Sequence, residues 1–187
     1  MNRPIKLLIL IILSLSVYFI YYHTNKPIKV LVLGDNPNTF SSNSVIINNK
    51  YASNNLSIKY LFERIKLERT IKRDLIESHK LILSIGYNDL LYDLSIEDNI
   101  NNHHFSKITK SIEKDYNNLI KEIRKYYKNE IIVTGYPKSQ KEDYYINIGI
   151  KKLNKILKNN KEVIYIDTYY CQNKDIENKI IHEILAK

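Results

Sequence analysis

KVLVLG at Lys29–Gly34 is the stretch that decides the fold, because its pattern returns as LILSIG at Leu81–Gly86 and as IIVTG at Ile131–Gly135. Each stretch is a run of Val, Ile and Leu without polar alternation, which is typical of parallel strands buried on both faces. The chain has only four glycines, and three of them close these runs. Because a glycine lets the backbone turn sharply where parallel strands end and ligands commonly bind, the sequence predicts a site at that edge.

Helical periodicity fills the sequence between the strands. Apolar residues recur at helical spacing over Ser57–Glu77 and on one face of a long segment from Ser106 to Tyr127. The other expected elements are an Asn-rich loop from the GYND turn to His104, a helix over Asp143–Asn159, a strand at Glu162–Ile166, a final helix from Ile176 and a short extra strand at Ser44–Ile47. This alternation predicts a three-layer α/β/α sandwich with right-handed crossovers.

The amino-terminal segment is apolar enough to cross a membrane. Leu7–Thr24 contains no Asp, Glu, Lys or Arg, follows the basic residues Arg3 and Lys6, and has about the length that a membrane-spanning helix needs. Bulky tyrosines follow its apolar core, whereas signal-peptide cleavage favours small residues there. We expect an uncleaved membrane anchor, and a cleaved signal peptide is the alternative.

The chain is therefore divided into an anchor over residues 1–28 and one domain over residues 29–187. The positive charges that flank the apolar segment nearly balance, so they do not decide its orientation. A short basic leader before an apolar core is also what an export signal looks like. We therefore expect a single-pass protein of the cell membrane whose domain lies outside the cytoplasm.

Charge and metal-ligating residues narrow the possible partners. The 29 Lys plus Arg against 20 Asp plus Glu give a net charge of +9, which can attract nucleic acid, anionic lipid or wall polymer. Lysines and acidic residues alternate along the segment from Lys107 to Lys128, as on a solvated helix face, so nucleic acid is not the expected partner. His103 and His104 are adjacent and lack metal-ligand spacing, and the single Cys171 supports no disulfide. We expect neither a metal nor a cofactor.

The strand-end blocks KVLVLGDN, LILSIGYNDLL, IIVTGYP and VIYIDTYY resemble, in order and spacing, those of the SGNH/GDSL hydrolases. This esterase and lipase superfamily has a parallel, flavodoxin-like sheet, and the resemblance covers roughly Lys29 to Tyr170. Its most specific block is Gly86-x-Asn88-Asp89, in which the family's Asn side chain donates to the oxyanion. The resemblance implies binding residues at Asp35, Asn36, Gly86, Asn88 and Asp89. Asn54, in YASNN, matches the block that supplies a further donor.

The chain departs from this family at the nucleophile and at the general base. The family chemistry requires a serine after the first strand and a histidine three residues after an aspartate. Here Asn36 stands at the serine position, and Lys179 stands three residues before His182, the last histidine. An amide cannot replace the serine hydroxyl as a nucleophile. We expect His182 to lie within the closing helix rather than to act as a base.

The sequence thus predicts a membrane-anchored, extracytoplasmic SGNH/GDSL-like domain that is catalytically inactive and acts by binding an envelope polymer, lipid or protein. Two alternatives stay open. The first is a divergent esterase or acyl-transfer enzyme acting on envelope lipids or glycans, which uses Asn36 and Asn88 in an altered mechanism. The second is a basic scaffold domain that adheres to anionic polymer or lipid.

Overall fold

The computed structural model describes residues 11–19, 27–35, 45–96, 102–139, 144–171 and 173–185. Its centre is a five-stranded sheet in which all neighbouring strands are parallel, in the order β2-β1-β3-β4-β5. The strands are β1 (Ile28–Gly34), β2 (Val45–Ala52), β3 (Lys80–Ser84), β4 (Ile131–Thr134) and β5 (Val163–Ile166). The predicted parallel α/β fold is confirmed, and the extra strand expected at Ser44–Ile47 is the start of the longer β2.

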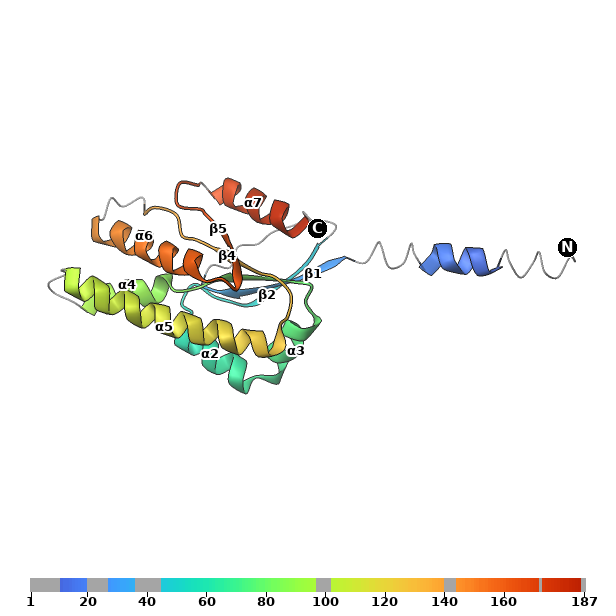
Figure 1. Cartoon of the computed structure of the whole chain (residues 1–187), viewed down its shortest axis with the longest axis horizontal. Coiled ribbons are helices and arrows are strands. Elements are labelled where there is room, and N and C mark those ends of the chain that lie inside the picture. The colour runs from blue at the N-terminus through green and yellow to red at the C-terminus, as the bar shows by residue number, and fades with distance from the viewer. Residues whose placement is uncertain are drawn as a thin grey trace, which may run out of the picture.

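The helices cover the two faces of the sheet unequally (Figure 1). One face carries α2 (Ile58–Leu67), α3 (Arg69–Glu77), α4 (Tyr87–Ile96), α5 (Asn102–Tyr126) and α6 (Tyr144–Asn159). The other face carries α7 (Asn173–Leu185). Strand side chains alternate between the two layers, so Leu31 and Leu33 join the larger core cluster while Val30 and Val32 join the smaller one under α7.

The segment predicted as one helix over Ser57–Glu77 is two helices. Glu68 has φ −88° and ψ 114°, which is extended backbone, and it separates α2 from α3. Its carboxylate accepts two hydrogen bonds from the Arg64 guanidinium, at 2.6 and 2.9 Å. Leu67 is 76% exposed, so this residue falls outside the apolar face that Ile65 and Ile71 continue. The apolar pattern survives because both helices pack on the same core.

The segment expected as a loop from the GYND turn to His104 is partly helical. Helix α4 begins at Tyr87, directly after the strand end, and buries Leu90 and Leu94 one turn apart. His103 and His104 lie in the first turn of α5 rather than in a loop. Helix α4 has only ten residues, and its polar first residues resemble a turn, so its apolar periodicity was too short to predict a helix.

The predicted membrane anchor is described only in part. Residues 11–19 are helical, and their large apolar side chains range from 46% exposed at Ile11 to 66% at Tyr18. In the part of the chain that the structure describes, no helix is long and apolar enough to span a membrane. Residues 7–10 and 20–24 of the predicted segment lie outside the described ranges, as does the whole connection at residues 36–44.

Candidate functional site

Strand β1 ends in a glycine that allows a close approach to the end of β3. Gly34 has φ 124°, and a Cβ atom built on it would lie 1.8 Å from the carbonyl oxygen of Ser84. The next backbone N–H, that of Asp35, donates to the same oxygen at 2.7 Å. Only glycine fits this position, because both the left-handed backbone and the close approach exclude a side chain. The arrangement places the Asp35 carboxyl at the start of α4.

The Asp35 carboxylate joins three parts of the fold. Its Oδ2 accepts hydrogen bonds from the backbone N–H groups of Gly86, Tyr87 and Asn88, at 3.1, 2.9 and 3.3 Å. Its Oδ1 accepts a hydrogen bond from the Tyr136 hydroxyl, beyond the end of β4. These N–H groups belong to the first turn of α4, which has no partners for them within the helix. Asp35 therefore stabilises the start of α4 from a neighbouring strand.

Burial dominates the electrostatics of this carboxyl. Asp35 is 8% exposed. Desolvation raises its pKa from 3.8 to about 6, against the hydrogen bonds from Tyr136 and from the helix amides, which lower it. Desolvation, together with the adjacent Asp35, also raises the pKa of the Tyr136 phenol well above its usual value. The Tyr136 phenol therefore keeps its proton at neutral pH and donates it in the hydrogen bond to the Asp35 carboxylate.

Asn88 and Asp89 attach α4 to the loop before α2. The Asn88 Nδ2 donates to the carbonyl oxygens of Asn54 and Leu56, at 2.6 and 3.1 Å. The Asp89 carboxylate accepts from the backbone N–H of Ile58, at 3.2 and 3.0 Å from its two oxygens. Desolvation raises the pKa of Asp89. Because a side-chain amide has two N–H donors, both donors of Asn88 are used in holding this loop.

A pocket of about 640 Å³ opens at this edge of the sheet, above Asp35 and Asn88. The rings of Tyr87 and Tyr136 stack beside it, with centroids 5.3 Å apart and planes inclined by 22°. Its lining combines these rings and apolar side chains with a few polar groups: Asp35, Asn54, Tyr87, Asn88, Leu91, Tyr136, Pro137, Lys138, Ser139 and Ile146. A mainly apolar hollow with several converging polar groups is typical of a small-molecule site.

Of the residues expected from the sequence, Asp35, Asn54 and Asn88 line this pocket together. Gly86 contributes its backbone N–H to Asp35, and Asp89 turns toward α2. Asn36 lies outside the described residues.

His182 is exposed on α7, and no histidine is among the described residues that line the pocket. Tyr136, Lys138 and Ser139 also line the pocket, although no role was predicted for them from the sequence. The IIVTGYP block contained a signal for them, because it ends the strand next to β3.

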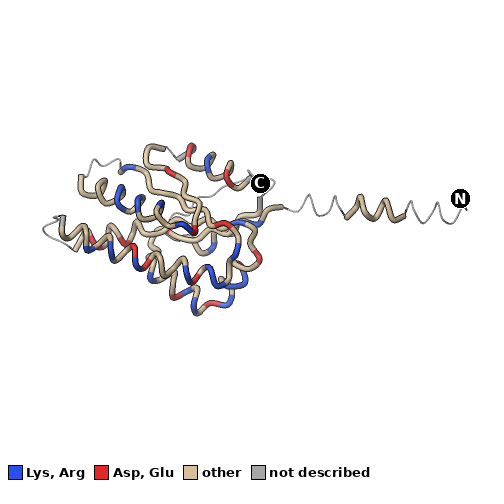
Figure 2. Tube along the Cα trace, viewed as in Figure 1, with Lys and Arg blue, Asp and Glu red and all other residues tan. Residues whose placement is uncertain are grey.

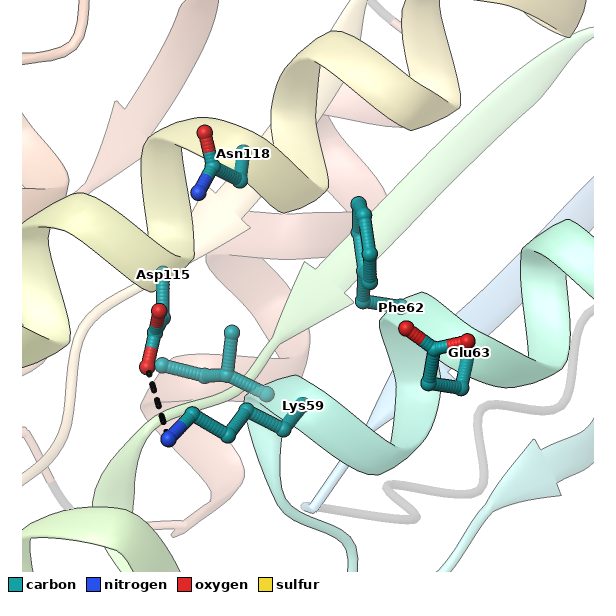
Figure 3. Close-up of a pocket in the computed structure, with 6 residues that line it drawn as sticks. Lys59, Phe62, Glu63, Asp115 and Asn118 are labelled. Carbon is teal, nitrogen blue, oxygen red and sulfur yellow. Dashed lines mark ion pairs between the residues drawn. The ribbon is translucent and has the colours of Figure 1, made fainter.

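A second hollow, of about 300 Å³, lies between α2 and α5, away from the strand ends (Figure 3). Lys59 and Asp115 point toward one another across it, with 3.7 Å between the ammonium and the carboxylate. Phe62, Glu63 and Asn118 complete the labelled lining. This hollow gathers an ion pair and a ring on two helix surfaces, without strand-end loops, so the edge pocket is the better candidate. Among the described residues, no group of three or more His, Cys, Asp or Glu could hold a metal.

Comparison with known proteins supports the fold. No family model and no curated protein sequence matches the chain. Among solved structures, it is similar to a lipase from a goat rumen metagenome, with a TM-score of 0.65 and 15% identity over 84% of this chain and 97% of that one. A lipolytic G-D-S-L family protein from Veillonella parvula matches with a TM-score of 0.61 and 12% identity, over 86% and 99% of the two chains.

An acetylxylan esterase from Geobacillus stearothermophilus matches with a TM-score of 0.52 and 13% identity, over 82% and 80% of the two chains. The neighbours are thus lipolytic enzymes and esterases of the SGNH/GDSL type, and the predicted SGNH/GDSL-like fold is confirmed. At these identities the likeness concerns the fold alone.

Proposed function

We propose that this chain, whose fold is that of the SGNH/GDSL hydrolases, is a catalytically inactive domain that binds a ligand at the cell envelope. The observation that carries the proposal is the placement of Asn88. Both N–H donors of its amide are bonded to the carbonyls of Asn54 and Leu56. Stabilising an oxyanion requires donors aimed at the place where its charge develops. Here the amide that the resemblance assigns to this task holds a loop instead.

Two further residues, Asn36 and Asp35, support the same conclusion. Asn36 replaces the serine nucleophile in sequence. The Asp35 carboxyl is engaged with α4 and Tyr136, so it is not available as a base toward a substrate. Acyl transfer needs both an activated nucleophile and a group that takes its proton. Without them, the pocket retains the means to bind a ligand but not to hydrolyse it.

The pocket chemistry suits an acylated sugar or polyol. Stacked tyrosine rings and aliphatic side chains offer apolar surface to a sugar ring or an acyl group. Asn54, Lys138 and Ser139 lie around them to meet hydroxyl and carbonyl oxygens. One structural neighbour is an acetylxylan esterase. We propose for this chain only the general class of that substrate, an acylated glycan.

The amino-terminal segment gives this domain its location. We propose that Leu7–Thr24 anchors the chain in the cell membrane and that the domain faces the envelope side. The support is the uncharged apolar stretch with its basic leader. The described part of that stretch exposes its apolar side chains, as Leu15 does at 61%. Exposed apolar side chains on a helix favour contact with lipid over contact with water.

A divergent esterase is the second candidate, and Ser139 is the observation that favours it. Ser139 lines the edge pocket next to Lys138 and follows the strand beside β3. A serine there could take the role of nucleophile if a neighbouring group accepted its proton. The two candidates differ in one measurable property, the turnover of esters.

The test uses the full-length protein, purified in a non-ionic detergent, with short p-nitrophenyl esters and a fluorophosphonate probe for activated serines. We expect neither ester turnover above buffer nor labelling. Asn36→Ser should not restore turnover, because the general base is still missing. Turnover that disappears in Asn36→Ala would refute the inactive domain. Labelling that is lost in Ser139→Ala but kept in the exposed control Ser106→Ala would establish the esterase.

A further inference from the structure

The positive charge of this protein is unevenly distributed, and α6 carries the clearest excess. Among the helices with described bounds, only α6 combines four lysines with no acidic residue; Lys151, Lys152, Lys155 and Lys158 are its charged residues. The tube view shows repeated basic bands along α6, whereas basic and acidic bands alternate along α5 (Figure 2). Glu142 and Asp143 precede α6 in sequence and lie outside the described residues.

The lysines on one face of α6 also lack ion-pair partners. Some cations elsewhere are paired, as Lys80 is with Glu130 at 3.0 Å and Lys125 is with Glu122 at 2.6 Å. Lys155 and Lys158 make no ion pair with any carboxylate of the described residues, and Lys151 contacts the Tyr169 ring, 5.4 Å from its centroid. Their charges are therefore available to an external anion.

These lysines line grooves that share lining residues with one another and with the edge pocket. A groove of about 240 Å³ beside β5 is lined by Lys151, Lys155 and Lys158 with Tyr165, Asp167 and Tyr170, among others. The next groove, of about 270 Å³, shares Lys151 and Tyr169 with it and contains Lys138. Lys138 in turn lines the edge pocket. We call Lys138, Lys151, Lys155 and Lys158 the lysine track.

The shape of the track fits a linear ligand. Lys151 and Lys158 are two helical turns apart, which corresponds to about 10 Å along the axis of α6. Regularly spaced ammonium groups along a groove match a chain with repeated negative charges, whereas a flat lipid surface needs no groove. Lysine binds phosphate as a point charge, without the planar, two-pronged geometry of arginine. The track thus suits a chain of phosphodiesters.

The aromatic side chains beside the track offer one well-exposed ring in each groove. Tyr169 is 8% exposed and already faces Lys151. Burial raises the pKa of the Tyr165 phenol, whose ring is partly covered. Tyr170, 86% exposed, contacts the Tyr169 ring edge to face, with centroids 4.8 Å apart, and Tyr144 of the second groove is 71% exposed. Grooves that bind single-stranded nucleic acid offer successive rings to successive bases, so the arrangement favours a phosphate chain without bases.

One carboxylate, Asp167, also lies in the first groove. It accepts a hydrogen bond from the backbone N–H of Tyr169 at 3.0 Å, which fixes its position at the start of the loop after β5. Three lysines surround the same groove. The local charge consequently stays positive.

We propose that the lysine track binds a linear polyol-phosphate polymer of the cell envelope and leads one end of it to the edge pocket. The inference deepens the proposed function, and it rests on that function only where the polymer enters the pocket. Binding along the track depends on its lysines and not on whether esters are hydrolysed. Loss of one property therefore leaves the other measurable.

The experiment measures binding of a short fluorescent poly(glycerol phosphate) oligomer to the full-length protein in non-ionic detergent, by fluorescence anisotropy at low and at near-physiological salt. The track variant combines Lys151→Gln, Lys155→Gln and Lys158→Gln. The matched control combines Lys107→Gln, Lys110→Gln and Lys114→Gln on α5, which removes the same charge from exposed positions of another helix. Circular dichroism verifies that both variants are folded.

We expect the wild-type protein to bind the oligomer more weakly as salt increases, because binding releases counterions. The track variant should bind about tenfold more weakly or worse at low salt, with a smaller salt dependence, and the control should stay within about twofold of wild type. Absence of wild-type binding, or equal losses in both variants, would overturn the proposal. So would tighter binding of an oligothymidylate with the same number of phosphates, because the partner would then be nucleic acid.

Discussion

Replacing Asp35 by asparagine should remove a pH dependence of stability without removing the contacts around it. The amide oxygen can accept from the backbone N–H groups of α4, as Oδ2 of Asp35 does. The amide nitrogen can donate to the Tyr136 hydroxyl, which is able to accept as well as donate. Asp35→Asn therefore leaves each buried polar group with a partner, while the titratable carboxyl disappears.

The magnitude follows from the burial of this carboxyl. Desolvation raises its pKa from 3.8 to about 6, and each pKa unit corresponds to about 1.4 kcal/mol, so the shift amounts to about 3 kcal/mol. The folded protein binds this proton more tightly than the unfolded chain does. This contribution to stability is thus fully present below the unfolded pKa of about 4 and is lost as the pH rises through about 6.

The assay is urea unfolding of the full-length protein in non-ionic detergent, at several pH values between about 4 and 7. The free energy of unfolding of Asp35→Asn, minus that of wild type, should increase by about 3 kcal/mol over this range. A constant difference for Asp35→Asn would refute the reasoning. A decrease would do so as well, because the helix amides would then outweigh desolvation.

Three other predictions concern the loop before α2, the strand-end glycines and the membrane anchor. Asn88→Ala should lower the free energy of unfolding by about 1–3 kcal/mol, because the carbonyls of Asn54 and Leu56 lose their donor. His182→Ala, at an exposed position, should leave the thermal midpoint nearly unchanged, and equal effects of the two substitutions would contradict the assignment. Gly34→Ala should destabilise the fold by more than about 3 kcal/mol, since its methyl group meets the Ser84 carbonyl at 1.8 Å. Gly86→Ala should cost less by the same thermal melt, because its methyl group meets side-chain methyl groups of Leu153 and Ile58, at 3.1 and 3.5 Å, rather than a backbone carbonyl, although its φ of 117° also disfavours alanine. Full-length protein should sediment with membranes while a chain starting at Lys26 stays in the supernatant, and protease added to intact cells should remove the domain; protection until permeabilisation would reverse the proposed orientation.

The strands were predictable because their signal is local. KVLVLG, LILSIG and IIVTG need burial on both faces, and only a parallel sheet between helical layers supplies it. Even β2 was partly visible, as the β-branched run at Ser44–Ile47. The extension of β2 to Ala52 could not be predicted, because polar groups interrupt its apolar pattern. The Asn48 amide and the Tyr51 hydroxyl donate hydrogen bonds to the Asp74 carboxylate on α3, a contact that only the fold reveals.

Helix α4 was missed because its cap comes from elsewhere in the chain. A helix start is recognised in sequence by a capping residue just before it. Here the group that accepts from the first N–H groups is Asp35, which lies 51 to 53 residues away. The break at Glu68 was missed for a related reason, because the apolar positions on either side fit one helix and the interruption is visible only in the exposed Leu67.

The candidate site was predictable in position but not in use. Asp35, Asn54 and Asn88 meet at one pocket, as the ends of adjacent parallel strands must. That the amide of Asn88 holds the loop before α2 depends on the path of that loop, which no local pattern encodes. The lysine track was not predicted, because the spacing of its lysines along α6 is that of an ordinary solvated helix face. Only the fold shows that the grooves they line share residues with one another and with the edge pocket.

The unequal covering of the sheet has a consequence for how the protein is made. The smaller core cluster places Val30, Val32 and Ile82 against Ile176 and Ile180 of α7. The ribosome synthesises α7 after all five strands. In a nascent chain the layer formed by α2 to α6 can assemble first, while this face of the sheet still lacks α7. During that interval an apolar surface faces the surroundings and is open to chaperones or to self-association.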